Sequence, residues 1–148
     1  MTSNVNILVP LDGSVLAEEA VTVALEIAYP AGGTLTLFVV EHSEATSAVH
    51  AFADAEGMTG AMAAAAYLDQ VAVRVQDQGV EAVKESGDGT NPAVDIIERA
   101  AAADISMIAL TSHGQSGIGR WLLGSVADKV ARSATVPVVI VPSPGRGD

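Results

Sequence analysis

The sequence predicts an α/β fold in which a doubly wound, five-stranded parallel sheet is sandwiched by four helices. Apolar, β-branched runs alternate with segments whose apolar residues recur at helical spacing, and Gly, Pro, Asn and Asp separate the two kinds of segment. The 148 residues, 49% of them hydrophobic, suit a single domain over residues 1–148. Because aromatic residues make up only 3% of the chain, the core must consist of Val, Ile, Leu and Ala.

The first strand, helix and second strand form a crossover unit. Residues 5–11 (VNILVPL) are apolar and β-branched and end at the turn sequence Asp-Gly-Ser, as a buried strand would. A helix follows, in which Ser14 can act as a cap, Glu18 favours the positive end, and apolar residues recur at helical spacing up to Pro30. A pair of glycines then leads into a second strand at residues 34–40 (TLTLFVV).

The middle of the chain is expected to add a helix and an edge strand. Residues 41–58 have no clear period, so they are interpreted as a loop whose structure and role the sequence does not define. Residues 59–78 are alanine-rich, carry Tyr67 on an apolar face, and end at Gly79, which indicates a long helix. Residues 80–86 (VEAVKES) are half polar and suit a strand at a sheet edge.

The last part of the chain predicts two more helices and two more strands. A helix is expected from Pro92, a residue favoured at the first helical position, to about Ala102. Residues 105–111 (ISMIALT) form an almost wholly apolar strand of the kind covered on both faces. Residues 125–134 are helical, and residues 136–142 (VPVVIVP) form a final strand whose two prolines suit a sheet edge.

The glycine-rich stretch at residues 112–130 (SHGQSGIGRWLLGSVADKV) points to a phosphate site. In doubly wound sheets, ligands lie outside the carboxyl ends of the strands at the switch point, expected here between the first strand and the one ending at Thr111. Glycines let the backbone approach a ligand. Gly124-Ser125 opens a helix whose first N–H groups and positive dipole end favour an anion.

Two common phosphate motifs are absent from the sequence. The P-loop pattern G-x-x-x-x-G-K-[ST] does not occur. The dinucleotide fingerprint fails because Gly117-x-Gly119 is followed by Leu122, where glycine or alanine is needed. Neither family is supported, so the phosphate site must be built differently.

Plainer interpretations exist for each of these residues. Asp12 before Gly13 is what an ordinary turn uses, and a cluster of glycines can be a flexible connection. Ser125 is also an ordinary N-cap residue, a role that can coexist with anion binding. Catalysis by His113 is disfavoured because no Ser or Cys nucleophile has an evident third partner.

Composition excludes several classes of function. The net charge of −11 argues against a nucleic-acid partner, because binding a phosphate backbone depends on Lys and Arg. The chain has no cysteine, and His42, His50 and His113 lack metal-ligand spacing, so no metal site is expected. The N-terminus has no basic flank and no long apolar run, so a cytoplasmic protein without a membrane segment is expected.

Along nearly its whole length the chain resembles a universal stress protein, through ILVPLDGS, TLFVVEH, DIIERA, ADISMIAL, the glycine-rich stretch and PVVIVP. The ATP-binding members carry Gly, two residues, Gly, nine residues, Gly, and Ser or Thr. Gly114, residues 115–123 and Gly124-Ser125 match the later part, whereas Thr111 replaces the first glycine. The resemblance implies a Rossmann-like, adenine nucleotide alpha hydrolase-like fold.

The resemblance also implies a set of nucleotide-binding residues: Pro10, Asp12, Val39, Leu110, Thr111, His113, Gly114, Gly124, Ser125 and Val126. Pro10 and Asp12 would line the adenosine pocket, with Asp12 accepting from a ribose hydroxyl, and Val39 would hold adenine through its backbone. Leu110 and Thr111 would flank the ribose and α-phosphate. His113 and Gly114 would border the phosphates. Gly124, Ser125 and Val126 would bind the phosphates from the helix start.

The expected function is that of a nucleotide-dependent stress-response or signalling module that binds ATP, AMP or ADP. Mg²⁺ would bind through the phosphates, since it needs few protein ligands. The resemblance also implies a homodimer through the last strand, whose edge would otherwise present unpaired backbone groups. No catalytic residue is predicted.

Two alternatives stay open. One is a weak ATPase or phosphotransferase, whose hydrolysis would be slow at most because no catalytic base is evident. The other is a dimeric interaction protein that has lost nucleotide binding, which Thr111 favours because its branched side chain would crowd a ribose or phosphate. If Thr111 is extended, however, its N–H can still face the site and its hydroxyl adds a polar contact.

Overall fold

The structure is a computed structural model that describes residues 4–13, 15–40, 60–87, 91–112 and 124–142. Within these ranges, five strands form one sheet in the order β3-β2-β1-β4-β5, and neighbouring strands are parallel. The elements are β1 (Asn6–Leu11), α1 (Val15–Ala31), β2 (Thr34–Val40), α3 (Gly60–Asp77), β3 (Glu81–Gly87), α4 (Pro92–Ala100), β4 (Met107–Thr111), α5 (Ser125–Ser133) and β5 (Val138–Val141).

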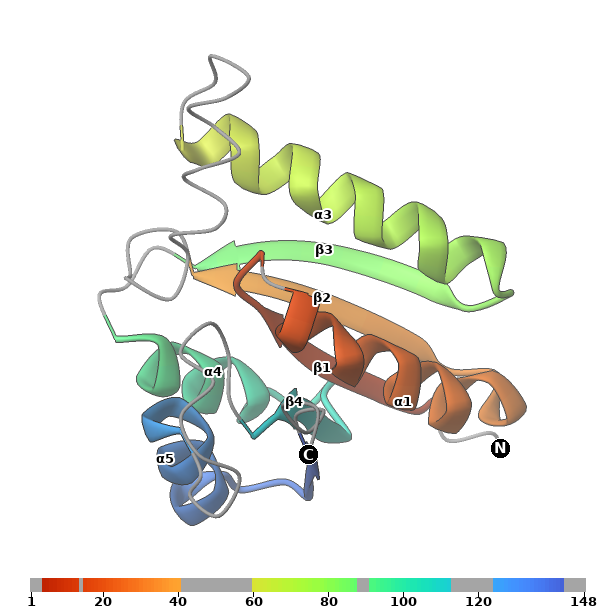
Figure 1. Cartoon of the computed structure of the whole chain (residues 1–148). Helices are drawn as coiled ribbons and strands as arrows, with labels where there is room; N and C mark the ends of the chain where they lie inside the picture. The colour runs from red at the N-terminus through yellow and green to blue at the C-terminus, as the bar shows by residue number, and fades with distance from the viewer. Residues whose placement is uncertain (1–3, 14, 41–59, 88–90, 113–123, 143–148) are drawn as a thin grey trace, which may run out of the picture.

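The helices cover both faces of the sheet (Figure 1). Helices α1 and α3 pack on one face and α4 and α5 on the other. Side chains along a strand alternate between faces, so Ile7, Val9 and Leu11 of β1 join the core under α1 and α3. Leu8, between them, joins the core under α4 and α5. The predicted doubly wound sandwich is confirmed.

The two predicted edge strands lie at the edges of the sheet. Strand β3, predicted from the half-polar residues 80–86, is one edge, and β5, predicted at residues 136–142, is the other. None of the residues of β3 is fully buried, which suits a strand with only one neighbour in the sheet. The expected loop at residues 41–58 and the expected cap at Ser14 lie outside the described residues.

Two glycines end α1 and start β2. The helix continues one residue past Pro30, then Gly32 adopts φ 63°, and the Gly33 amide donates to the carbonyl oxygen of Ala28 at 2.9 Å. Gly33 also lies tightly against Val5, the residue before β1, because a Cβ placed at Gly33 would be 2.5 Å from the Val5 carbonyl oxygen. The first glycine supplies a backbone conformation, and the second supplies space.

Helix α4 starts as predicted and ends earlier than expected. The Asn91 side chain caps it by accepting from the Val94 amide at 3.2 Å, and Pro92 is the first helical residue. The helix ends at Ala100, after which the amides of Ala101 and Ala102 donate to carbonyls three residues earlier, those of Glu98 and Arg99, at 3.2 and 3.3 Å, so the chain tightens into a turn. The prediction that it reaches Ala102 is therefore wrong by two residues.

Strand β4 starts later than predicted, at Met107 in place of residue 105. The Ser106 amide donates to the Asn6 carbonyl at 2.8 Å, but the Asn6 amide donates to the Ser106 hydroxyl at 3.0 Å. The hydroxyl oxygen of Ser106 thus takes the place of the backbone carbonyl that would continue the ladder between β1 and β4.

Candidate functional site

The switch point of the sheet lies between β1 and β4, as predicted. Strands β2 and β3 follow β1 on one side, whereas β4 and β5 lie on its other side. Connections therefore diverge from this pair, and the carboxyl ends of the parallel strands gather at one edge of the sheet (Figure 1). Ligands of doubly wound folds bind at such a point.

The β1–β4 ladder ends before the strands do. Strand β1 pairs with β2 over its whole length, but its register with β4 covers only Ile7 and Leu8. The Asn6 carbonyl faces β4, and because alternate residues face the same neighbour, Pro10 also faces β4. Pro10 has no N–H to donate, so β1 and β4 stop pairing on the way to their carboxyl ends.

Asp12 follows β1 directly and is only 9% exposed. Gly13 after it has φ 85°, a left-handed conformation that favours glycine and turns the chain toward α1. Asp12 also lies close to the end of β2, since the preceding Leu11 pairs with Val39. The buried residue Asp12 therefore lies one position beyond the Leu11–Val39 pair, at the carboxyl ends of β1 and β2.

The side chains of Val39 and Leu110 are used in packing. Val39 is fully buried in the core under α1 and α3, and Leu110 is 4% exposed in the core under α4 and α5. Neither side chain is therefore available to a ligand, and both residues lie in strand pairs, Val39 with Leu11 and Ser86 and Leu110 with Ile140. The backbone role that the resemblance implies for Val39 stays a prediction.

Thr111 points away from α5. Met107 and Ala109 contribute to the core under α1 and α3, whereas Ile108 and Leu110 contribute to the opposite core. Strand alternation therefore directs the side chain of Thr111, which is 7% exposed, toward the α1 and α3 face. No non-glycine residue of the described ranges has a positive φ, so Thr111 needs no glycine conformation.

A hydrogen bond joins the end of β4 to the start of α5. The Ser112 amide donates to the Val141 carbonyl at 2.9 Å, and the Gly124 amide donates to the Ser112 carbonyl at 2.8 Å. The chain therefore returns to the point that it left after β4. His113 and Gly114, two predicted site residues, lie in the part of the chain that is not described.

The start of α5 presents amides beside this junction. Gly124 is the N-cap, with φ −63° and ψ 161°, and its carbonyl accepts the first helical bond from Asp128 at 2.9 Å. The amides of Ser125, Val126 and Ala127 precede that bond and point out of the positive helix end. The reading of Ser125 as the N-cap is wrong, because Ser125 is the first helical residue and a glycine without a side chain occupies the cap position.

A carboxylate in the first turn of α5 is paired with a cation. Asp128 would repel an anion at the helix start, but its two oxygens accept from Nε of Arg132 at 3.0 and 3.1 Å. This exposed pair offsets part of the negative charge near the amides.

Within the described ranges, no group of three or more His, Asp or Glu side chains is placed to hold a metal ion. Equally, none of the described helices is both long and apolar enough to cross a membrane.

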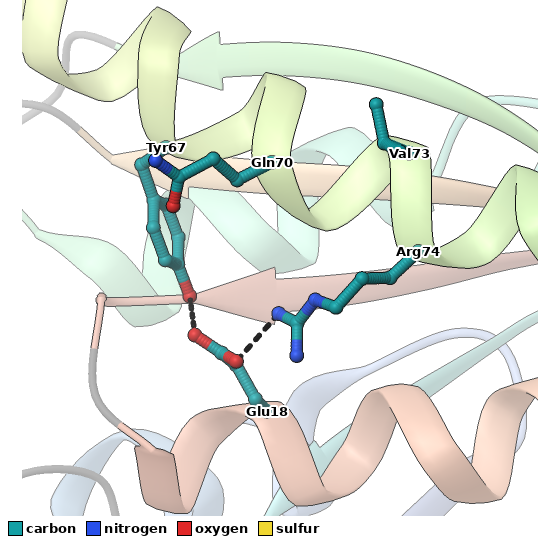
Figure 2. A pocket seen from close by; sticks show the side chains of 5 residues that line it. All are labelled: Glu18, Tyr67, Gln70, Val73 and Arg74. Atoms are coloured by element: carbon teal, nitrogen blue, oxygen red, sulfur yellow. Dashed lines mark hydrogen bonds and ion pairs between the residues drawn. The ribbon is translucent and has the colours of Figure 1, made fainter.

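A second feature is a groove between α1 and α3 (Figure 2). Its lining residues are Glu18, Tyr67, Gln70, Val73 and Arg74. The Tyr67 hydroxyl donates to Oε2 of Glu18 at 2.8 Å, and Nη2 of Arg74 donates to Oε1 at 2.6 Å. The sequence interpretation placed Glu18 at a helix start and Tyr67 on an apolar face, and it did not identify either as a site residue.

The phenol of Tyr67 stays protonated. Its burial, its hydrogen bond to Glu18, and the negative charges of Glu18 and Asp12 raise the pKa of Tyr67 well above its ordinary value. The charge of Arg74 opposes this shift and does not cancel it. Asp12, at the end of β1, contributes less to this shift than burial and Glu18 do.

Comparisons with known proteins agree with the fold. The model of the universal stress protein family matches residues 4–142. Universal stress protein YxiE of Bacillus subtilis is 29% identical over an alignment 143 positions long, which covers 90% of this chain and 96% of that protein.

Two solved structures are also similar. Universal stress protein UspA from Lactobacillus plantarum has a TM-score of 0.74 and 27% identity, over 94% of this chain and 99% of that one. The universal stress protein from Archaeoglobus fulgidus in complex with dAMP has a TM-score of 0.66 and 23% identity, over 95% and 99% of the two chains. At that identity the second likeness concerns the fold alone.

Proposed function

The chain belongs to the universal stress protein family, and on that premise we propose that it binds an adenine nucleotide, ATP or AMP, at the carboxyl ends of β1 and β4. In this proposal it acts as a nucleotide-dependent stress-response or signalling module, not through turnover. The observation that carries the proposal is the hydrogen bond from Gly124 to Ser112, which brings the leading amides of α5 to the end of β4. The dAMP complex of the Archaeoglobus fulgidus protein supports the choice of ligand.

The proposed nucleotide extends from the end of β2 to the start of α5. Asp12 accepts from a ribose hydroxyl, Pro10 lines the same pocket, and the Val39 backbone holds adenine. Leu110 and Thr111 flank the ribose and α-phosphate. The phosphates lie between the start of α5 and the motif residues His113 and Gly114. The amides of Ser125 and Val126 donate to them, and the backbone of Gly124 lies alongside. Any Mg²⁺ is held mainly by the phosphates and water.

The direction of the Thr111 side chain supports nucleotide binding without the first motif glycine. This side chain lies on the sheet face opposite α5, so it does not cover the amides that would hold phosphate. Its strand conformation, paired with Val141, is one that a β-branched residue adopts readily.

The nucleotide proposal is tested by chemical analysis and calorimetry. The purified protein is denatured, the released small molecules are identified by mass spectrometry, and the stripped protein is titrated with ATP or AMP in the presence of Mg²⁺. We expect a released adenine nucleotide or saturable binding. If the folded protein releases no nucleotide and binds none, the proposal is refuted. That result would favour the alternative of a dimer that has lost the nucleotide site.

We also propose a cytoplasmic homodimer, formed across the edge strand β5, without a nucleic-acid partner. The four residues of β5 are all partly exposed. The Pro137 and Val141 carbonyls accept from β4, so alternation places the peptide N–H groups of Val138 and Ile140 on the outer side. An edge of this kind is a template for a second copy.

The dimer is tested with Ile140→Pro, which removes an outward N–H and spares the bonds to β4. Sedimentation should show a dimer for the wild type and for Ile140→Val, and a monomer for a folded Ile140→Pro variant. A wild-type monomer at micromolar concentration would remove the dimer proposal. A dimer that survives the proline would place the interface elsewhere.

A further inference from the structure

The groove between α1 and α3 holds the first turn of α1 in place. Glu18 lies in that turn, and each of its two carboxylate oxygens accepts from a side chain of α3. Figure 2 shows Tyr67 and Arg74 reaching from α3 toward Glu18. The turn that they hold begins at Val15, shortly after Asp12 and the left-handed Gly13. Six positions separate Glu18 from Asp12, so the two hydrogen bonds restrain the chain close to Asp12.

The phenol is the more buried of the two donors. Tyr67 is 9% exposed, whereas the side chain of Arg74 is 58% exposed, and that of Glu18 lies between them at 20%. A hydrogen bond from a buried donor to a carboxylate is stronger than an exposed ion pair, which solvent screens. The bond from Tyr67 is thus the main constraint on the Glu18 carboxylate, and Arg74 supplies the compensating charge.

The same phenol lies within electrostatic range of Asp12. The charge of Asp12 is one of the influences that keep Tyr67 protonated, and both residues are almost fully buried. Without the hydroxyl, Glu18 would lose its buried donor and would turn toward water. The first turn of α1 would then be less restrained next to the Asp12 carboxylate.

We infer that Tyr67 is a positioning residue of the proposed nucleotide site: by binding Glu18 it fixes the start of α1, and with it the Asp12 carboxylate that meets the ribose. This role depends on the proposed function, because it concerns the ribose contact of that site. Tyr67 itself does not touch the nucleotide. Removing its hydroxyl should therefore weaken recognition of the ribose hydroxyls and leave the phosphate contacts at α5 intact.

The test compares ATP with 2′,3′-dideoxy-ATP, which lacks the hydroxyls that Asp12 would bind. The wild type should prefer ATP. Tyr67→Phe should bind ATP about tenfold more weakly, as expected for a displaced hydrogen-bonding group, and should bind the dideoxy compound almost unchanged. In an Asp12→Asn background the same substitution should have little further effect, since both changes act on one contact.

Two further variants separate positioning from loss of stability. Arg99→Gln removes ion pairs to Glu85 and Asp104 on the α4 side of the sheet, so it should lower thermal stability without changing either affinity. Arg74→Gln changes an exposed residue, so it should fold and show a smaller loss in the same direction as Tyr67→Phe. If Tyr67→Phe does not fold, Arg74→Gln decides by the same comparison of the two nucleotides.

The outcomes distinguish the two proposals. If the wild type binds neither nucleotide, both the proposed function and the role of Tyr67 are overturned. If the wild type prefers ATP and Tyr67→Phe retains that preference and affinity, the positioning role alone is overturned. An equal loss for ATP and the dideoxy compound would also overturn it, because the effect would not act through the ribose contact.

Discussion

Replacing Gly124 by valine should block phosphate binding while leaving the fold intact. The glycine has φ −63° and ψ 161°, a region open to every residue, so valine introduces no backbone strain. Its isopropyl group would stand at the mouth of the amides of Ser125 and Val126. A hydrogen bond to a charged group contributes roughly 1.5–3 kcal/mol, and about 1.4 kcal/mol is tenfold in Kd. Losing one amide contact therefore predicts an ATP affinity about 10- to 150-fold weaker.

The control for this prediction is Ala131→Val, which enlarges an exposed residue of the same helix away from its start. In Gly124→Val, valine at the N-cap costs about 1 kcal/mol of stability, because valine is a poor N-cap residue. In Ala131→Val, valine within the helix costs up to about 0.7 kcal/mol, because it forms helices less readily than alanine. The two variants should therefore have similar melting temperatures. Calorimetric titration with ATP should separate them. Unchanged affinity in a folded Gly124→Val variant would refute the assignment of the phosphate site to the start of α5.

Two further predictions concern stability. Gly33→Ala should lower the free energy of unfolding by about 2 kcal/mol, because the added methyl group would overpack against Val5. Gly32→Ala should lower it by only about 1 kcal/mol, since there only the left-handed φ is unfavourable. Equal losses in chemical denaturation would contradict the close contact at Gly33. The hydrogen bonds from Arg99 lower the pKa of Asp104. The pKa of Asp104 is lower in the folded than in the unfolded protein. The Arg99–Asp104 pair therefore stabilises the fold at pH values above the unfolded pKa of about 3.9, and this stabilisation is lost as the pH falls. Arg99→Gln should therefore reduce the loss of melting temperature between about pH 5 and pH 3, and an unchanged acid profile would show that the pair contributes nothing.

Much of the fold could be predicted because it depends on local patterns. Continuous apolar runs identified the central strands, and the half-polar residues of β3 indicated an edge. Turn chemistry identified the start of α4 at Asn91 and Pro92. The errors are at element ends: α4 ends two residues early in a local turn, and at the start of β4 a contact between distant residues replaces the local pattern. Strand β4 starts late because the Ser106 hydroxyl bonds to Asn6, on a strand 100 positions earlier.

The candidate site was only partly visible in the sequence. Gly124-Ser125 could be recognised because a glycine at a helix start has a local physical meaning. The effect of Thr111 could not be judged, since it depends on which face of the sheet the side chain meets. Tyr67 was interpreted as apolar packing, and its burial is confirmed, but its partner Glu18 is 49 positions away.

The sequence by itself determined the alternation of strands and helices along the chain, the edge character of β3 and β5, and the start of a helix at Gly124-Ser125. These depend on the periodicity and backbone freedom of neighbouring residues. Only the tertiary structure decided that the β1–β4 ladder covers only Ile7 and Leu8, that Gly124 bonds to Ser112, and that α3 restrains the start of α1. Such contacts form when the sheet and its helices bury a common core, and no local pattern specifies which distant groups then meet.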